Sequence, residues 1–233
     1  MQIAGLQKMT LLDYPGKVAC TVFLPGCNFR CPFCHNAQLL GKDTEAIMDD
    51  TGLLAFLEKR RGLLDGVCIT GGEPTLQPEL IPLLRNIKAM GYCVKLDTNG
   101  YRPEVLRAAV EAGCVDYVAM DIKNGPTAYP QTAGLTSFQL STIEESILYL
   151  ASGAVAHEFR TTVVEPLHTE ESIREMADWI LHLVPAGVEK LFIQPFADRD
   201  SVPFSNLSAP NAEVLAQYLD IVKHCARDVA IRG

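Results

Sequence analysis

Three cysteines lie within one short loop, and they are the side chains of this chain best suited to chemistry. Cys27, Cys31 and Cys34 have the spacing C-x-x-x-C-x-x-C. Thiolates this close along a loop can converge on one metal centre, and Gly26 and Pro32 support a tight turn of the backbone. The spacing therefore predicts a metal site.

Three interpretations of this site compete. A four-iron cluster held by three cysteines leaves one iron without a protein ligand, as a site that binds substrate requires. Structural zinc would need a fourth ligand, for which His35 and Cys20 are candidates, but zinc sites usually combine two C-x-x-C pairs and this sequence has one. Cysteines that are merely buried form the third interpretation, which three cysteines in so short a loop disfavour. The spacing favours the cluster. We expect the remaining cysteines to be small buried hydrophobes: Cys20, Cys68, Cys93, Cys114 and Cys225.

The composition is that of an ordinary globular protein. Hydrophobic residues make up 48% of the 233 residues and charged residues 21%. The net charge of −8 argues against a nucleic-acid surface, which needs concentrated positive charge. A membrane span is not expected, because the sequence lacks an apolar run of sufficient length. The first residues do not resemble a signal peptide, so we expect a cytoplasmic protein.

The elements that must position the loop alternate between short apolar runs and longer amphipathic runs. Strands are expected at Val18–Leu24, Gly66–Thr70, Tyr92–Asp97, Asp116–Asp121, His157–Val163 and Glu189–Ile193. Helices are expected at Gly52–Arg61, Pro78–Met90, Pro103–Ala112, Ser141–Ser152, Glu170–Val184 and Asn211–Asp228. Parallel neighbours need long return connections, so this alternation predicts an α/β fold with a parallel sheet, a partial (β/α)6 barrel in one domain over residues 1–233.

Two local features refine this pattern. Ser141 and Glu144 have the spacing of a capping box, in which each side chain accepts a hydrogen bond from a backbone N–H at the start of a helix. Residues 124–140 contain several glycines and prolines, so we expect irregular structure there.

Polar residues and glycines follow the predicted strands, whereas the strands themselves are apolar. Active sites of such folds collect at the carboxyl ends of the strands. The candidates are Gly71, Gly72 and Glu73 after one strand, Asp97 and Thr98 at the end of the next, and Asp121 and Lys123 at the end of a third. Turn formation and helix capping are the plainer alternatives for these residue types. One edge of the sheet is therefore predicted to be a site.

The combined motifs resemble a known superfamily. The cysteine spacing with an aromatic residue before the last cysteine, followed by Gly-Gly-Glu-Pro after the next strand, resembles the radical S-adenosylmethionine (radical SAM) superfamily. The closer resemblance is to glycyl-radical-enzyme activases, through Asp13–Gly16, Phe33–Asn36, Leu96–Gly100 and Met120–Lys123. The opening AGLQKMTLLDYPGKVACTVFLPGCNFRCPFCHN is similar to that of anaerobic ribonucleoside-triphosphate reductase activating proteins.

The resemblance implies two cofactors, a [4Fe-4S] cluster on the three cysteines and S-adenosylmethionine. Glycine carbonyls at residues 71 and 72 would accept hydrogen bonds from the cofactor's amino group, Lys123 would meet its carboxylate, and His35 would contact its adenine. The full set of implied cofactor contacts is Phe33, Cys34, His35, Gly71, Gly72, Glu73, Asp97, Thr98, Asp121 and Lys123. Asp13 would hold the glycine loop of a partner protein, or serve only as a turn residue.

The implied reaction is reductive cleavage of S-adenosylmethionine to a 5′-deoxyadenosyl radical, which abstracts hydrogen from a glycine of a partner enzyme. The implied partners are anaerobic (class III) ribonucleoside-triphosphate reductase and a one-electron donor such as flavodoxin or ferredoxin. Some pyruvate formate-lyase activases carry a histidine where this chain has Pro195–Ala197, so that partner is less favoured. A small-molecule radical SAM enzyme and a zinc-stabilised interaction module without catalysis remain the alternatives.

Overall fold

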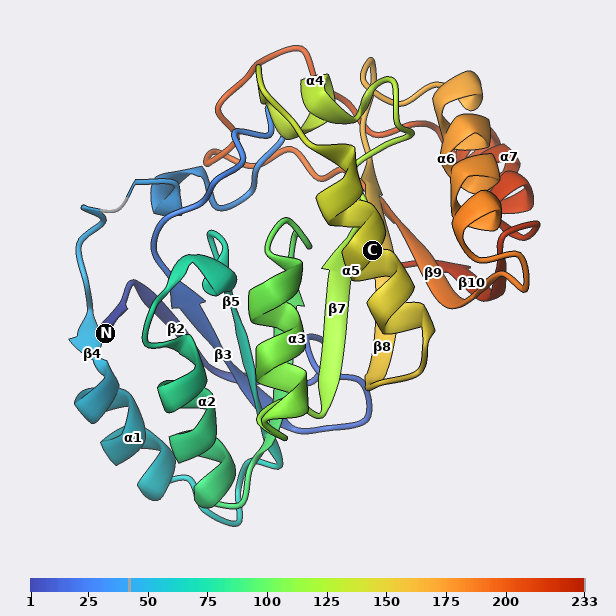
Figure 1. The fold of residues 1–233 in the computed structure, drawn as a ribbon. Coiled ribbons are helices and arrows are strands. Elements are labelled where there is room, and N and C mark those ends of the chain that lie inside the picture. The colour runs from blue at the N-terminus through green and yellow to red at the C-terminus, as the bar shows by residue number, and fades with distance from the viewer. Residues whose placement is uncertain (42, 233) are drawn as a thin grey trace. The chain divides into compact units, whose positions relative to one another are not determined.

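The computed structural model describes residues 1–41 and 43–232, and it confirms an α/β fold with a largely parallel sheet (Figure 1). Within that part of the chain, eight strands form one sheet in the order β10-β9-β8-β7-β6-β5-β3-β2. Their bounds are Gly5–Thr10 (β2), Ala19–Leu24 (β3), Gly66–Gly71 (β5), Cys93–Thr98 (β6), Tyr117–Asp121 (β7), Ala156–Val163 (β8), Val188–Pro195 (β9) and Ala226–Ile231 (β10). A separate antiparallel pair joins β1 (Gln2–Ile3) to β4 (Met48–Asp49).

All six predicted strands and all six predicted helices are present, with ends that differ by a few residues. The helices are Asp50–Glu58 (α1), Leu80–Ala89 (α2), Pro103–Glu111 (α3), Tyr129–Ala133 (α4), Leu140–Ala151 (α5), Glu170–Leu183 (α6) and Ala212–Val222 (α7). Short 3-10 helices cover Ala37–Leu39 (η1) and Pro74–Leu76 (η2). Every helix among the described residues is too short or too polar to span a bilayer.

The predicted last helix is too long, because its end belongs to an additional strand. Helix α7 ends at Val222, where the N–H of Cys225 donates to the Val222 carbonyl at 3.1 Å in a turn. The chain then pairs in parallel with β9 as β10. Val229 and Ile231 are β-branched, and such side chains favour a pleated surface over a helix. Residues 124–140, expected to be irregular, contain the short helix α4.

The capping box predicted at Ser141 and Glu144 is wrong. Helix α5 already begins at Leu140, and its N-cap residue Gln139 makes no side-chain capping bond. Glu144 instead accepts a hydrogen bond from Trp179 Nε1 at 2.9 Å. A long-range partner on α6 thus outcompetes the local backbone for this carboxylate.

The chain divides into two compact units. The first unit comprises Met1–Asn28, Gln38–Thr98 and Arg102–Ala119, and the second comprises Phe29–Ala37, Asn99–Tyr101 and Met120–Gly233. This division leaves the prediction of a single domain as a prediction.

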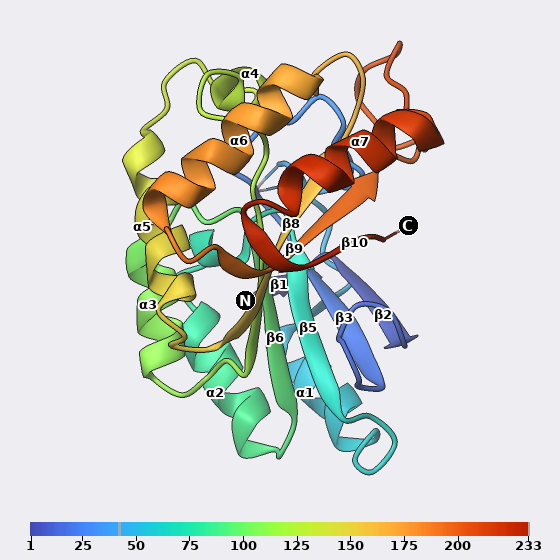
Figure 2. The same ribbon diagram turned by 90° about the vertical axis from the view of Figure 1, so that its right-hand side faces the viewer.

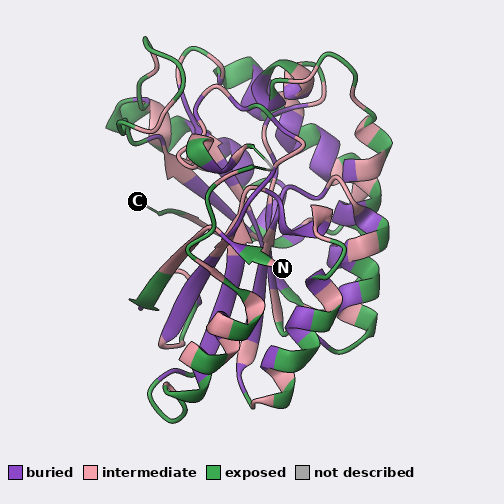
Figure 3. Ribbon diagram, turned by 90° about the vertical axis from the view of Figure 1, so that its left-hand side faces the viewer, coloured by how far each residue is buried: buried purple, intermediate pink, exposed green. Residues whose placement is uncertain are grey.

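In the first unit, β3, β5 and β6 pair in parallel and β2 pairs antiparallel with β3. Helices α1, α2 and α3 line up along one face of these strands (Figures 1 and 2). Strands β3, β5 and β6 are mostly buried, whereas β2 at the edge is largely exposed (Figure 3). Burial on both faces explains why the sequences of β3, β5 and β6 lack the alternation of a half-exposed strand.

In the second unit, β8, β9 and β10 pair in parallel, and α6 packs against both α5 and α7. Helix α6 begins with a capping box, in which Thr169 Oγ1 accepts from the Ser172 N–H at 3.2 Å and Ser172 Oγ accepts from the Thr169 N–H at 3.1 Å. This arrangement satisfies two backbone donors that a helix leaves without partners.

Helix α4 is joined to the cysteine loop by a backbone hydrogen bond. The Arg30 N–H donates to the Ala133 carbonyl at 2.9 Å. Gly134, which follows α4 with φ of 67°, lies so close to the loop that a Cβ there would stand 2.1 Å from the Arg30 carbonyl oxygen. The glycine therefore does two things: it adopts a left-handed conformation and it leaves room for the loop.

Replacing Gly134 should separate these two effects when it is compared with Gly153. Gly153 also has positive φ, of 80°, but a Cβ there would meet nothing within 4 Å. Gly153→Ala should cost about 1–2 kcal/mol through backbone strain alone. Gly134→Ala should cost a further ~1–3 kcal/mol because the methyl group displaces the loop. Urea unfolding of the two variants measures the difference, and equal losses would show that Gly134 does not hold the loop.

Candidate functional site

The three cysteines of the predicted metal site lie in a loop without regular secondary structure. Cys27 belongs to the first unit and is half-buried, and its N–H donates to the Leu40 carbonyl at 3.4 Å. Cys31 and Cys34 belong to the second unit, where the Cys34 N–H donates to the Cys31 carbonyl at 3.2 Å. All three are free thiols. Four of the other five cysteines are buried as expected, and Cys93 is half-buried.

Within the described residues, no three His, Cys, Asp or Glu side chains gather around a position for a single metal ion. In an iron–sulfur cluster each cysteine thiolate binds an iron of its own. The ligand role of the three cysteines therefore stays a prediction.

The predicted glycine pair, Gly71 and Gly72, ends β5 beside the start of the cysteine loop. A Cβ on Gly71 would lie 2.3 Å from both the backbone nitrogen and the carbonyl oxygen of Leu24, and a Cβ on Gly72 would lie 2.0 Å from the Gly26 carbonyl oxygen. The Glu73 N–H donates to that same oxygen at 2.7 Å. Only glycines permit this approach, so the two segments are held together by their backbones.

Glu73 is a buried carboxylate that holds its own surroundings in place. It accepts hydrogen bonds from the Thr75 N–H at 3.1 Å, from Thr75 Oγ1 at 2.5 Å and from Thr98 Oγ1 at 2.8 Å. A hydrogen bond of this kind is worth ~0.5–1.5 kcal/mol net. The predicted residues Glu73 and Thr98 are thus in contact, and both are engaged in joining the ends of β5 and β6.

Asp97 is paired with a lysine that the sequence pattern did not single out. Lys95 is 1% exposed, forms an ion pair with Asp97, and lies 3.8 Å from Cys68 Sγ. A lysine inside an apolar strand was the available signal, since lysine is almost never fully buried without a partner. The pair fixes the Asp97 carboxylate at the carboxyl end of β6.

Asp13 lies in the first unit, in the segment between β2 and β3. Its carboxylate accepts a hydrogen bond from Thr21 Oγ1, and its backbone N–H donates to Thr10 Oγ1 at 3.2 Å. These bonds are those of an ordered turn. The predicted role in binding a glycine loop stays a prediction.

The second unit brings Asp121 and Lys123 together with Arg160 on β8. Lys123 Nζ is 2.9 Å from Asp121 Oδ2, and Arg160 Nε is 3.0 Å from Asp121 Oδ1. Burial alone would raise the pKa of Asp121, but the two cations outweigh it and lower that pKa to about 2. Burial likewise opposes the charge on Lys123, whereas Asp121 raises the pKa of the ammonium group above its usual value. Both groups are therefore charged at neutral pH.

A buried histidine, also missed from the sequence, fixes the backbone of Lys123. His168 Nε2 lies 2.8 Å from the Lys123 carbonyl, and its Nδ1 lies 3.1 Å from the Val164 nitrogen. Burial lowers the pKa of His168, so the ring is neutral, with Nε2 donating to the carbonyl and Nδ1 accepting. Phe33 packs edge-on against this ring at 6.3 Å between centroids. The only signal for His168 in the sequence was the position of this residue, five residues beyond the end of β8.

Cys31 is subject to the same charges. Burial raises the pKa of its thiol to about 11, and Lys123 acts in the opposite direction. A thiol in such surroundings is neutral until a metal replaces its proton. Three thiols in one loop, one of them under the influence of a buried ammonium group, are a donor set that fits a thiolate-bound iron–sulfur cluster.

The His35 ring makes a hydrogen bond through one nitrogen and a stacking contact through one face. Its Nε2 lies 2.7 Å from the Ala197 carbonyl, and its ring stacks on Phe196 with centroids 5.6 Å apart. Burial lowers the pKa of the imidazole, and because a carbonyl only accepts, Nε2 carries the proton. A contact with adenine is thus left to Nδ1, the other ring face or the backbone, and it stays a prediction.

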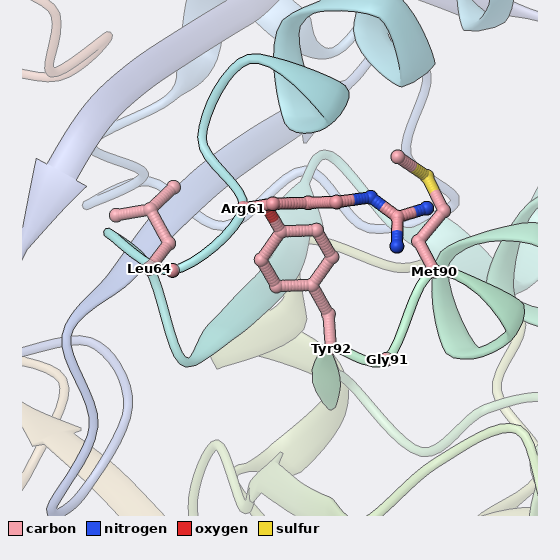
Figure 4. A pocket seen from close by; sticks show the side chains of 6 residues that line it. Arg61, Leu64, Met90, Gly91 and Tyr92 are labelled. Carbon is pink, nitrogen blue, oxygen red and sulfur yellow. The ribbon is translucent and has the colours of Figure 1, made fainter.

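The cavity shown in Figure 4 belongs to the first unit. It has a volume of about 180 Å³ and is lined by Arg61, Gly62, Leu64, Met90, Gly91 and Tyr92. Leu64 and Tyr92 precede β5 and β6, so the cavity is at the amino ends of these strands. The predicted residues Gly71 and Asp97 are at the opposite, carboxyl ends.

Comparison with known proteins identifies relatives along the whole chain. A Methanocaldococcus jannaschii protein, assigned by name to the glycyl-radical enzyme activating enzymes, is 31% identical across 99% of this chain and 95% of its own length. The pyruvate formate-lyase-activating enzyme of Clostridium pasteurianum is 33% identical over 53% of this chain and 52% of the enzyme. A Saccharolobus islandicus protein named as a GTP 3′,8-cyclase is 40% identical over 32% of this chain and 24% of its own length.

Solved structures share the fold at low sequence identity. A radical SAM methyltransferase from Sphaerobacter thermophilus has a TM-score of 0.73 and 14% identity over 96% of this chain and 68% of that one. SuiB from Streptococcus suis, solved with S-adenosylmethionine, has a TM-score of 0.64 and 13% identity over 91% of this chain and 52% of that one. The predicted partial-barrel fold is therefore confirmed. Residues 21–180 match the Radical SAM superfamily, and the chain belongs to this superfamily as a radical SAM enzyme.

Proposed function

We propose that this chain is the activating enzyme of a glycyl radical enzyme, and that its partner is an anaerobic ribonucleoside-triphosphate reductase. The observation that carries the proposal is the similarity to an activating enzyme across 99% of the chain. The similarity to a cyclase that acts on a small molecule covers only 32% of it. The choice of reductase as partner rests on the resemblance of residues 4–36.

In this proposal Cys27, Cys31 and Cys34 hold a [4Fe-4S] cluster. When bound, the cluster and S-adenosylmethionine supply a one-electron reductive cleavage that yields a 5′-deoxyadenosyl radical able to abstract hydrogen from a glycine Cα. The electron comes from a donor such as flavodoxin or ferredoxin. The residues of the chain bind and orient these groups and exclude water around them.

Lys123 is the residue best suited to hold the carboxylate of S-adenosylmethionine. Its ammonium group has three donors, and its one side-chain partner among residues 1–41 and 43–232 is Asp121. Asp121 holds the ammonium group, and His168 holds the backbone of Lys123. Because Asp121 uses one of the three N–H donors, two are available to an incoming carboxylate. A charge-assisted hydrogen bond in such buried surroundings is short and strong.

In the first unit, the predicted contacts carry groups that complement those of S-adenosylmethionine. Gly71 and Gly72 expose backbone without side chains at the end of β5, and their carbonyl groups would accept from an ammonium group. Asp97, held by Lys95, adds a carboxylate at the end of β6. Glu73 and Thr98 act by holding these two strand ends to each other.

The activation assay tests the proposal directly. The chain is reconstituted anaerobically with iron and sulfide, then mixed with reductant, S-adenosylmethionine and the anaerobic ribonucleoside-triphosphate reductase from the same organism. We expect a glycine-centred doublet in the electron paramagnetic resonance spectrum. Cys31→Ala should abolish both this signal and the production of 5′-deoxyadenosine, because a cluster ligand is lost.

Cys114→Ala is the matched control, since Cys114 is buried outside the cysteine loop and should leave both signals intact. Production of 5′-deoxyadenosine without a glycyl radical would retain the cleavage reaction and reject this partner. A colourless protein that contains zinc would reject the enzymatic proposal altogether and support an interaction module.

Lys123→Met should weaken binding of S-adenosylmethionine about tenfold or more, because the carboxylate loses a charged donor in buried surroundings. Equilibrium dialysis of the reconstituted, unreduced protein measures the dissociation constant. Lys88→Met is the control, since Lys88 pairs with Asp116 through an exposed ion pair in the first unit. Unchanged affinity in Lys123→Met would assign Lys123 a purely structural role beside Asp121.

A further inference from the structure

The hydroxyl group of Tyr129 is fully buried, and its O–H group has no acceptor among the described residues. A buried polar group without a partner costs free energy that a phenylalanine at the same position would not. Residues that carry such a cost are concentrated at functional sites. The surroundings of this hydroxyl therefore indicate what it is kept for.

The ring of Tyr129 is held in one orientation by other aromatic side chains. It stacks on Phe138 with centroids 4.9 Å apart and packs edge-on against Trp179 at 6.2 Å. Phe138 also contacts Phe29 of the cysteine loop, at 6.5 Å. These contacts fix the ring without involving the hydroxyl, so the direction of the O–H bond is set by packing.

Tyr129 lies on the side of α4 that meets the cysteine loop. Tyr129 and Ala133 are four residues apart on α4 and therefore lie on the same helix face. The Ala133 carbonyl accepts from the Arg30 N–H of the loop, so this face is the one that meets the loop. The charges of Lys123, Cys31 and Asp121 all act on the pKa of the phenol, in agreement with this placement near the loop.

Of these three groups, only Cys31 becomes a new hydrogen-bond acceptor when the protein binds a cluster. Lys123 cannot accept from the phenol O–H here. Its ammonium group is a donor, and its backbone N–H can only donate to the phenol oxygen. The Asp121 oxygens accept from Lys123 and Arg160. The Cys31 sulfur is a weak partner as a thiol but a charged acceptor as a thiolate. A phenol is protonated at neutral pH, so this hydroxyl is a donor.

We propose that the Tyr129 hydroxyl donates a hydrogen bond to the Cys31 thiolate of the bound iron–sulfur cluster and raises the reduction potential of that cluster. Hydrogen bonds to the sulfurs are among the features that set cluster potentials. A donor stabilises the reduced cluster more than the oxidised one, because reduction adds negative charge. The unpartnered hydroxyl is then half of an interaction that cluster binding completes. This inference rests on the proposed cluster, but not on the identity of the partner enzyme.

The test compares Tyr129→Phe with Tyr92→Phe in reconstituted, cluster-loaded protein. Tyr92 is a buried tyrosine of the first unit whose hydroxyl already donates to the Leu57 carbonyl at 2.7 Å. A redox titration followed by electron paramagnetic resonance, without S-adenosylmethionine, gives the midpoint potential. Tyr129→Phe should lower it by about the equivalent of a tenfold change in the reduction equilibrium, 59 mV for one electron. Tyr92→Phe should leave it unchanged.

Thermal unfolding of the cluster-free proteins provides the second readout. Tyr129→Phe should melt about 2–4 °C higher than the unsubstituted chain, because it removes an unsatisfied hydroxyl, whereas Tyr92→Phe should melt lower. An unchanged midpoint potential in Tyr129→Phe would overturn the inference, as would a shift seen only with S-adenosylmethionine present. Failure to bind any cluster is distinguishable from both, since it would contradict the proposed function instead.

Discussion

The close approach of two backbones at the ends of β3 and β5 is the constraint on which the first unit's part of the site depends. Neither Gly71 nor Gly72 has space for a side chain, because Leu24 and Gly26 occupy it. The approach fixes where the cysteine loop leaves β3 and brings the Gly26 carbonyl to the Glu73 N–H. Glu73 then extends the same constraint to Thr98 on β6 through its carboxylate. A glycine pair and one buried acid thereby set the positions of three strand ends.

A different kind of interaction organises the second unit, where buried charges require partners. Removing charges from water is costly, and a buried ion pair offsets this cost only with good geometry and further hydrogen bonds. Asp121 meets this condition with both oxygens engaged, by Lys123 and by Arg160. His168 adds a fixed backbone at Lys123 without adding charge. The resulting group of side chains is rigid, charged and supplied with spare donors, which are the properties that a site for an anionic group requires.

The sequence predicted the fold and the residues at the strand ends because both depend on local patterns. Apolar runs separated by amphipathic runs identify the strands of a parallel sheet, and the polar residues that follow them need no knowledge of packing. Lys95, Arg160 and His168 were missed because their importance comes from partners that are distant in the chain, or from the face of a strand on which they lie. In a strand buried on both faces, the hydrophobic pattern does not tell one face from the other. The Ser141 capping box failed for a related reason, since Glu144 has a better partner in Trp179.

Tyr129 shows how the polar groups of a chain carry information about what the chain binds. Folding would gain nothing from this hydroxyl if the described residues were its whole environment, since phenylalanine packs equally well between Phe138 and Trp179. The same holds for the two spare donors of Lys123. Lys123 and Cys31 act electrostatically on each other and on Tyr129, and both sets of donors would be satisfied by the negative charge of a bound anionic group. Donors left without acceptors around one buried thiol are the polarity expected of a protein that is complete only when an anionic centre is bound.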